Sequence, residues 1–580
     1  MEFELIMKKA LIAIAIITAG VTTYLYQQQS EPQHNVQLPT MNELAFVPAD
    51  TLLFFGQLQA FPIKNYLTYF NFGQTESQRA ALEYDLLETE EPSGIFFANL
   101  MQQYSQAVAS PELFTQTFGL NDEVKGLFYT VGLLPVIRYE IAKPEALWQM
   151  LATAEKESGL VGKKETIQGL EVVKYELVNQ DGQSLELVVA VQHGWATITF
   201  NSSFNEPADL LQALALEKPK SSLAQTDTLQ AITSRHQLDG KSVGFFNHEA
   251  LINGLTGKEN NLFSQMLNRV SQNQLDTEMA QMRSPACQAD FATIASNWPR
   301  TVFGSEKLVI EADEIVMRTK MVVESQSSVL KSLASIRGFL PDFTQSAEQK
   351  MLSFALGVDV AKVSPALTNI WTEFTEAKYS CQPLVDMQQE AKQNNPMMLT
   401  MMTSMATGVK GVSASLLDLQ LSQQQGEPQF DKLDALVTVS ANNPIALFNS
   451  VKGFYAPLME VSLPADGSSI MLGEYLDLPF GLAKSIQLAA KGEHLVLFKG
   501  EKAEKLADSL SKQDLTANGF NNFAMDYQAL FGAVFTLIEE SGEEIPPEFA
   551  ALKDLNMQLY FDTDFTDQGI EMVSEISSKK

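Results

Sequence analysis

Residues 137–148 have the sequence IRYEIAKPEALW, and residues 437–448 have the sequence VTVSANNPIALF. The two stretches lie 300 positions apart, so that Pro144 corresponds to Pro444 and Trp148 to Phe448. In both, apolar residues alternate as in a half-buried strand. Proline then stands where a helix can begin, because its fixed φ suits the first helical turn and its missing N–H costs nothing there. The sequence therefore predicts a strand that ends in a turn and continues as a helix, twice in the chain.

Further segments repeat in the same order. The shift of 300 also pairs Leu52 with Leu352 and Phe54 with Phe354, about eighty residues before the first match, which argues against chance similarity. The shift falls to 279 later in the chain, where Ala250 corresponds to Ala529. Each copy ends with a predicted hairpin, at 308–323 and 557–576. We therefore expect an α+β fold of two tandem related modules, each an antiparallel sheet packed with helices, behind an N-terminal transmembrane anchor.

The composition is that of a globular protein with more than one core. The chain has 580 residues, of which 45% are hydrophobic and 19% are charged. Lys and Arg number 40 against 70 Asp and Glu, which gives a net charge of −30. This excess repels phosphate backbones and anionic head groups, so we expect no nucleic acid partner and no direct binding to lipid surfaces.

The amino terminus predicts export. Lys8 and Lys9 precede residues 10–26, an uncharged apolar segment. As a helix it would span roughly 26 Å, slightly less than the ~30 Å hydrocarbon core. It is either a single-pass anchor in a bacterial inner membrane or a cleaved signal, and Tyr24 and Tyr26 favour the anchor. The lysines predict a cytosolic amino terminus and a periplasmic bulk, while cleavage would give a soluble periplasmic protein.

These features predict a division of the chain. The expected parts are 1–9, a cytosolic segment; 10–26, the anchor or signal; 27–43, a polar tether; 44–324, module one; 325–344, a connecting segment; and 345–580, module two.

The chain has only two cysteines, Cys287 and Cys381. In an oxidising compartment they would form a disulfide, and we expect one, although a pair of buried thiols is the alternative. Because one cysteine lies in each predicted module, the bond would join the two copies.

Short motifs resemble a known family. Val47–Thr51 contains the sequence PADT after a valine, Pro144–Leu147 is a proline-initiated helix start, and Trp195–Leu214 has a hairpin–helix pattern. In these features the chain resembles an uncharacterised family of membrane-anchored bacterial extracytoplasmic proteins with a PADT-like opening strand. The resemblance implies an extracytoplasmic location and an α+β fold, and it brings no catalytic residues.

A methionine-rich segment is the most unusual part of the sequence. On a helix, its five methionines would lie in two adjacent rows and form one broad, adaptable apolar face. Such a face predicts contact with a hydrophobic ligand or another helix, while packing in the core of module two is the plainer alternative. The residues are Met397, Met398, Met401, Met402 and Met405.

Candidate catalytic residues are few. Ser242 lies in a G-x-S-x-G pattern, which marks the nucleophile elbow of serine hydrolases, but the apolar strand follows the serine here instead of preceding it. The five histidines lack metal-binding spacing, and His248 beside Glu249 is the best isolated acid–base candidate. Asp562, Asp564 and Asp567 crowd one hairpin, where turn formation explains them as well as a metal site does.

The leading hypothesis is a non-enzymatic, membrane-anchored periplasmic protein that binds or scaffolds another envelope protein, without a cofactor or a metal. One alternative is a carrier of a hydrophobic ligand that uses the methionine face. The other is an exported serine hydrolase that uses Ser242.

Overall fold

The computed structural model confirms the strand–turn–helix prediction at both copies of the repeated stretch. β3 (Leu134–Glu140) leads into α6 (Pro144–Ser158), and β13 (Glu427–Ala441) leads into α17 (Pro444–Val451). Each helix begins with its proline, as the absent N–H allows. The structure describes residues 38–39, 41–70, 91–180, 183–271, 277–311, 313–393, 406, 408–424, 427–473, 475, 485–541 and 556–579.

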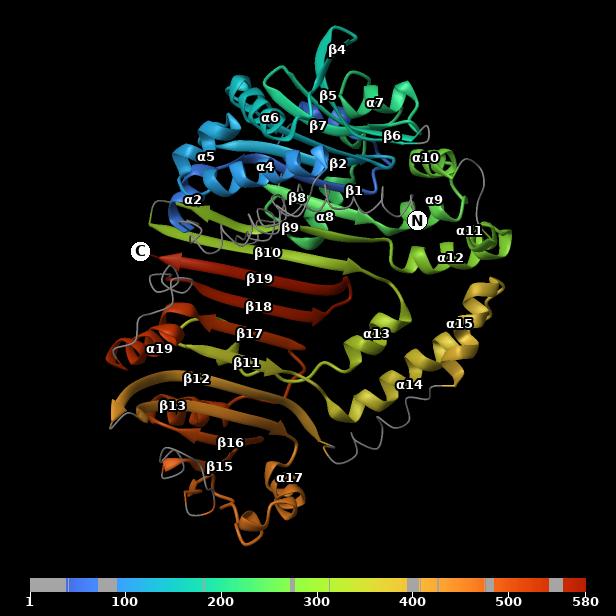
Figure 1. The fold of residues 1–580 in the computed structure, drawn as a ribbon. Coiled ribbons are helices and arrows are strands. Elements are labelled where there is room, and N and C mark those ends of the chain that lie inside the picture. The colour runs from blue at the N-terminus through green and yellow to red at the C-terminus, as the bar shows by residue number, and fades with distance from the viewer. Residues whose placement is uncertain are drawn as a thin grey trace. The chain divides into compact units, whose positions relative to one another are not determined.

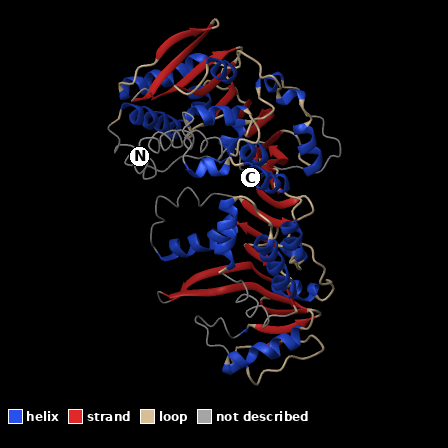
Figure 2. Ribbon diagram, turned by 90° about the vertical axis from the view of Figure 1, so that its right-hand side faces the viewer, coloured by secondary structure: helices blue, strands red, loops and turns tan. Residues whose placement is uncertain are grey.

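The chain divides into two compact units. Among the described residues, unit 1 extends to Met321 and also includes Ser380–Pro383. Unit 2 covers Val322–Tyr379 and continues from Leu384. Figure 2 shows helices packed beside the strands in each unit.

The strands of unit 1 pair antiparallel, and their spatial order in the sheet differs from their order in the sequence. From one side to the other they are β4 (Lys163–Ile167), β5 (Leu170–Gln180), β6 (Gln183–Gln192), β7 (Trp195–Ser202), β3, β2 (Val124–Val131), β1 (Leu53–Phe61), β8 (Ser242–Asn247), β9 (Arg300–Ile310) and β10 (Glu314–Glu324), whose last three residues belong to unit 2.

The helices of unit 1 pack against each other and against these strands. α4 contacts α5 and α6, and α12 contacts α9. Besides α6 they are η1 (Asn42–Phe46), α2 (Ile63–Phe70), α4 (Pro92–Ala107), α5 (Pro111–Phe118), α7 (Pro207–Ala213), η2 (Leu223–Gln225), α8 (Thr228–His236), α9 (His248–Leu255), α10 (Leu262–Val270), α11 (Thr277–Met282) and α12 (Pro285–Asn297).

The strands of unit 2 also pair antiparallel, as Figure 1 shows for the neighbouring strands β17, β18 and β19. Their order is β14 (Ile470–Met471), β15 (Gln487–Lys491), β16 (His494–Lys499), β13, β12 (Val409–Gln424), β11 (Leu352–Leu356), β17 (Asn521–Asp526), β18 (Gln558–Phe565) and β19 (Gly569–Lys579). The helices besides α17 are α13 (Ser328–Ser335), η3 (Asp342–Thr344), α14 (Val360–Glu376), α15 (Gln382–Lys392), η4 (Lys452–Phe454), η5 (Ala456–Leu458), α18 (Glu501–Leu510) and α19 (Tyr527–Ser541).

The two units repeat one strand order. The hairpin β6–β7 lies beside β3, followed by β2, β1, β8 and β9. In unit 2 the hairpin β15–β16 lies beside β13, followed by β12, β11, β17 and β18. Corresponding strands occupy corresponding positions, so the sequence repeat reflects a repeated pattern of hydrogen bonding.

The predicted shift at the opening strand is wrong by one residue. The cross-strand row through Ile137 contains Phe128 and Phe55, and the equivalent row through Val437 contains Ala414 and Phe354. Phe354 therefore corresponds to Phe55, a shift of 299 (354 − 55), and not to Phe54. The error arose because residues 52–55 read Leu-Leu-Phe-Phe, so Leu352 and Phe354 match them equally well at either shift.

The predicted fold class is also wrong. Hydrogen bonding places the strands of the described residues in one 19-stranded antiparallel sheet, not in a separate sheet for each module. Sequence similarity reveals which strands correspond, but it contains no signal for how sheet edges pair, because backbone N–H and C=O groups are the same in every residue.

The predicted anchor gains no support from the structure. None of the helices in the described part of the chain combines the length and apolar character that spanning a membrane requires. Residues 10–26 themselves lie outside the described residues.

Candidate functional site

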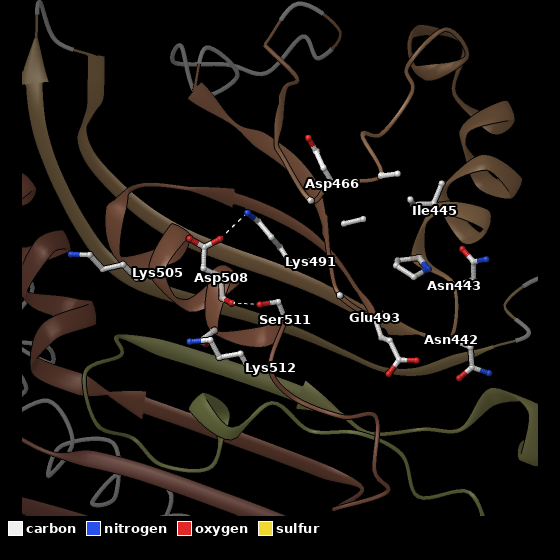
Figure 3. Close-up of a pocket in the computed structure, with 16 residues that line it drawn as sticks. Asn442, Asn443, Ile445, Asp466, Lys491, Glu493, Lys505, Asp508, Ser511 and Lys512 are labelled. Carbon is white, nitrogen blue, oxygen red and sulfur yellow. Dashed lines mark hydrogen bonds and ion pairs between the residues drawn. The ribbon is translucent and has the colours of Figure 1, made fainter.

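A cavity of about 760 Å³ lies in unit 2 where the second copy of the repeated stretch turns into α17. Four segments of the chain form its walls, and Figure 3 shows them converging. They are Asn442–Ile445 at the start of α17, Ala465–Gly467 in the following loop, Ala490–Glu493 in the turn between β15 and β16, and residues from Lys505 to Lys512 in and after α18. The volume lies within the range of natural small-molecule sites.

The first wall is the turn encoded by Asn442, Asn443 and Pro444. The side chain of Asn443 accepts a hydrogen bond of 2.9 Å from the N–H of Ala446 and caps the helix. The N–H of Ala441 donates to the carbonyl of Glu493 over 2.9 Å, which fastens this turn to the β15–β16 turn. The equivalent bond in unit 1 joins Ile141 N–H to the carbonyl of Gly194 over 2.8 Å. The pocket is therefore built on backbone contacts that both units share.

The opposite wall is fixed by core packing. α18 buries Ala503, Ala507 and Leu510 against Val496 and other apolar residues of the sheet. This places the end of α18 close to Gly492, which has φ +60°. A Cβ there would approach Ser511 backbone atoms to 3.2 Å, so glycine suits both the conformation and the contact.

Charged side chains of both signs surround the cavity. Lys491 Nζ lies 2.7 Å from Asp508 Oδ1, as the dashed line in Figure 3 marks. Lys505 Nζ lies 2.6 Å from Glu501 Oε1, and this hydrogen bond lowers the pKa of the Glu501 carboxyl. Hydrogen bonds from the side chain and backbone of Ser468 lower the pKa of Asp466. The carboxyl groups of Glu501 and Asp466 are therefore ionised at neutral pH.

Lys512 and Glu493 differ from these residues. Both are exposed and line the cavity, Lys512 just after α18 and Glu493 on the β15–β16 turn (Figure 3). Within the described residues, neither side chain has an ion-pair partner. The arrangement can hold a polar ligand through ion pairs and hydrogen bonds.

The predicted disulfide is confirmed. Cys287 and Cys381 are bonded, with sulfur atoms 2.02 Å apart. Asp290, one helical turn after Cys287 on α12, accepts hydrogen bonds from the backbone N–H groups of Ser380 (2.6 Å) and Cys381 (2.8 Å). Since Ser380–Pro383 belong to unit 1, the bond joins two segments of that unit instead of joining the two copies.

The predicted hydrophobic contact face lies outside the described residues. It comprises Met397, Met398, Met401, Met402 and Met405.

Ser242 is the first residue of β8 and is buried, with 5% of its surface exposed. Its Oγ lies 3.1 Å from Ser305 Oγ, and Ser305 donates a hydrogen bond to Asp239. A nucleophile elbow instead presents an exposed serine between a strand and a helix. The contacts of Ser242 are those of a structural residue at a strand start.

The other predicted polar residues have local roles. His248 Nδ1 lies 3.0 Å from the carbonyl of Trp298, and Nε2 lies 3.1 Å from Thr301 Oγ1, so both ring nitrogens are occupied. Asp564 forms a bidentate ion pair with Arg337. The described residues contain no cluster of three or more His, Cys, Asp or Glu side chains that could hold a metal ion.

Apart from the repeated stretch, the pocket residues are not among those predicted from sequence. One available signal is the concentration of five lysines between 491 and 512 in an acidic chain. The other is the replacement of Ala142 and Lys143 by two asparagines in the second copy. Comparison of the sequence with family models, with curated proteins and with solved structures finds no match.

Proposed function

We propose that this protein is a non-enzymatic binding or scaffolding protein of the bacterial envelope, exported through residues 10–26. That segment is either retained in the inner membrane or cleaved to leave a periplasmic protein. The observation that supports binding is the open pocket of unit 2, whose polar groups face solvent and whose walls are fixed by backbone hydrogen bonds and core packing. Pre-formed concave sites of this size are typical of proteins that bind small molecules or chain segments.

The Cys287–Cys381 disulfide supports the extracytoplasmic part of the proposal. Structural disulfides persist in oxidising compartments and are rare in a reducing cytosol. Trapping of free thiols in intact cells should therefore leave both cysteines unmodified. Quantitative modification of Cys287 and Cys381 would overturn the proposed location.

The binding function is tested by filling the pocket. Ala465 lines the cavity and is exposed, so Ala465→Trp should block the site without disturbing the core. Ala142→Trp is the matched control, because Ala142 is exposed at the equivalent turn of unit 1. We expect molecules that crosslink to and copurify with the native wild-type protein, identified by mass spectrometry, to be retained by the control and lost from Ala465→Trp. Identical sets of molecules in all three proteins, or none in any, would contradict the proposal.

A further inference from the structure

The charges around the pocket are not equally available to a ligand. Asp508 neutralises Lys491, and Glu501 neutralises Lys505. Asp466 is turned towards Ser468, with Oδ1 2.6 Å from Ser468 Oγ. Asp466 has no basic partner among the described residues, but the side chain and the backbone N–H of Ser468 both occupy its Oδ1. Lys512 and Glu493 are the charged lining residues whose side chains have no partner in the described part of the chain, and they lie on two different walls of the same cavity.

A ligand with a charge of only one sign fits this arrangement poorly. An anion would meet Lys512 but would also face Glu493, and the net charge of −30 would oppose its approach. A cation would be attracted by the net charge and would meet Glu493, but it would face Lys512 and leave that ammonium group without a partner. A molecule with one group of each sign satisfies both side chains, and the field of the whole protein does not repel it, because its own net charge is zero.

Apolar atoms lie between the charged walls. Pro444, Ile445, Ala465 and Ala490 line the cavity together with the charged residues. A ligand that fills the site therefore has charged ends and a partly apolar middle. A cavity of about 760 Å³ has room for more than a single small ion.

We infer that the pocket of unit 2 binds short peptides with free termini, with the peptide carboxylate at Lys512 and the peptide amine at Glu493. This inference rests on the proposed binding function and names the ligand class for the same site. Because both side chains are exposed, each ion pair contributes little, and the affinity is expected to be weak and to fall with added salt.

The probes are trialanine with free termini, its N-acetylated form and its C-amidated form. Binding to the full-length protein is measured by titration calorimetry at low and at high ionic strength. Acetylation and amidation should each weaken binding by about two- to five-fold at low salt, as the loss of one exposed ion pair implies. The difference should shrink at high salt.

Two variants assign the ends of the peptide. Lys512→Gln should bind the free and the amidated peptide equally while still discriminating against the acetylated one. Glu493→Gln should show the reverse. Lys502→Gln is the matched control, because Lys502 lies on α18 but pairs with Asp418, outside the pocket lining, and it should behave as the wild type.

The possible failures are distinguishable. Equal binding of all three peptides, or discrimination that both variants leave unchanged, overturns the assignment. If no peptide binds but Ala465→Trp still loses molecules that the wild type retains, the ligand class is wrong and the binding function stands. If both experiments fail, the binding function is wrong as well.

Discussion

His494 illustrates how a polar residue is accommodated next to the pocket. Its side chain is fully buried, although the neighbouring Glu493 is exposed. Ser440 Oγ lies 2.8 Å from Nδ1, and the carbonyl of Gln513 lies 3.4 Å from Nε2. Because a carbonyl can only accept, Nε2 carries the proton and Ser440 donates to Nδ1. The neutral ring is thus hydrogen-bonded on both sides.

Burial lowers the pKa of His494, while the Gln513 carbonyl and the charge of Glu493 oppose this effect less strongly. In the unfolded chain the imidazole has its usual pKa of about 6.5. Below that pH the unfolded chain binds the proton first, so stability falls as pH decreases, by at most about 1.4 kcal/mol per pH unit from this group.

Wild type should therefore lose more free energy of unfolding between about pH 7.5 and pH 5.5 than His494→Gln does, measured by urea denaturation. His193→Asn, which changes an exposed turn residue, should retain the wild-type dependence, and equal losses in all three proteins would contradict the role of His494.

At the scale of elements, β1 and β11 differ in which side chains they bury, although their sequences are similar. Phe55 is buried in unit 1, whereas its counterpart Phe354 is 43% exposed. Shifting a strand by one residue turns every side chain to the other face of the sheet. In β11 the fully buried residues are Ser353 and Ala355, on either side of Phe354, so the counterpart of the buried Phe55 points to the opposite face from them.

Thiol crosslinking tests this register. With the observed register Phe354 lies opposite Ala414, whereas the shift of 300 would place it opposite Ser415. The double variant Phe354→Cys, Ala414→Cys should therefore crosslink on mild oxidation. Phe354→Cys, Ser415→Cys should not, because neighbouring residues of a strand point to opposite faces. The native cysteines are already bonded and do not interfere, and peptide mapping by mass spectrometry identifies the products. Crosslinking of the second pair alone would show that Phe354 corresponds to Phe54, as the shift of 300 predicts.

At the scale of the whole molecule, the disulfide links distant parts of the sequence within unit 1. Cys287 and Cys381 are 94 positions apart, and the chain between them passes through residues of unit 2. Closing so long a loop restricts the unfolded chain strongly, which is one source of the stabilisation that disulfides give.

Loss of this bond should destabilise unit 1. Cys287→Ser, Cys381→Ser and the double variant should each lower its free energy of unfolding by about 2–5 kcal/mol, and by equal amounts, because all three remove the same bond. Urea denaturation followed by tryptophan fluorescence is a suitable measurement, since Trp148, Trp195 and Trp298 lie in unit 1. A wild-type transition that reductant leaves unchanged would show that the bond does not stabilise the protein.

The sequence alone determined the features that depend on neighbouring residues or on a simple count. Proline sets its own φ and restricts the residue before it, so the turns at Pro144 and Pro444 could be predicted. A chain with two cysteines allows only one disulfide, so that pairing needed no further information.

Tertiary structure alone decided the single sheet, the register of β11 and the pocket. Strand edges and register depend on hydrogen bonds between backbone groups that are alike at every position, and doubled residues such as Leu52-Leu53 and Phe54-Phe55 fit two registers equally well. The pocket forms where four segments between residues 442 and 512 meet. Local preferences act over a few residues, whereas these contacts depend on the packing of the folded chain.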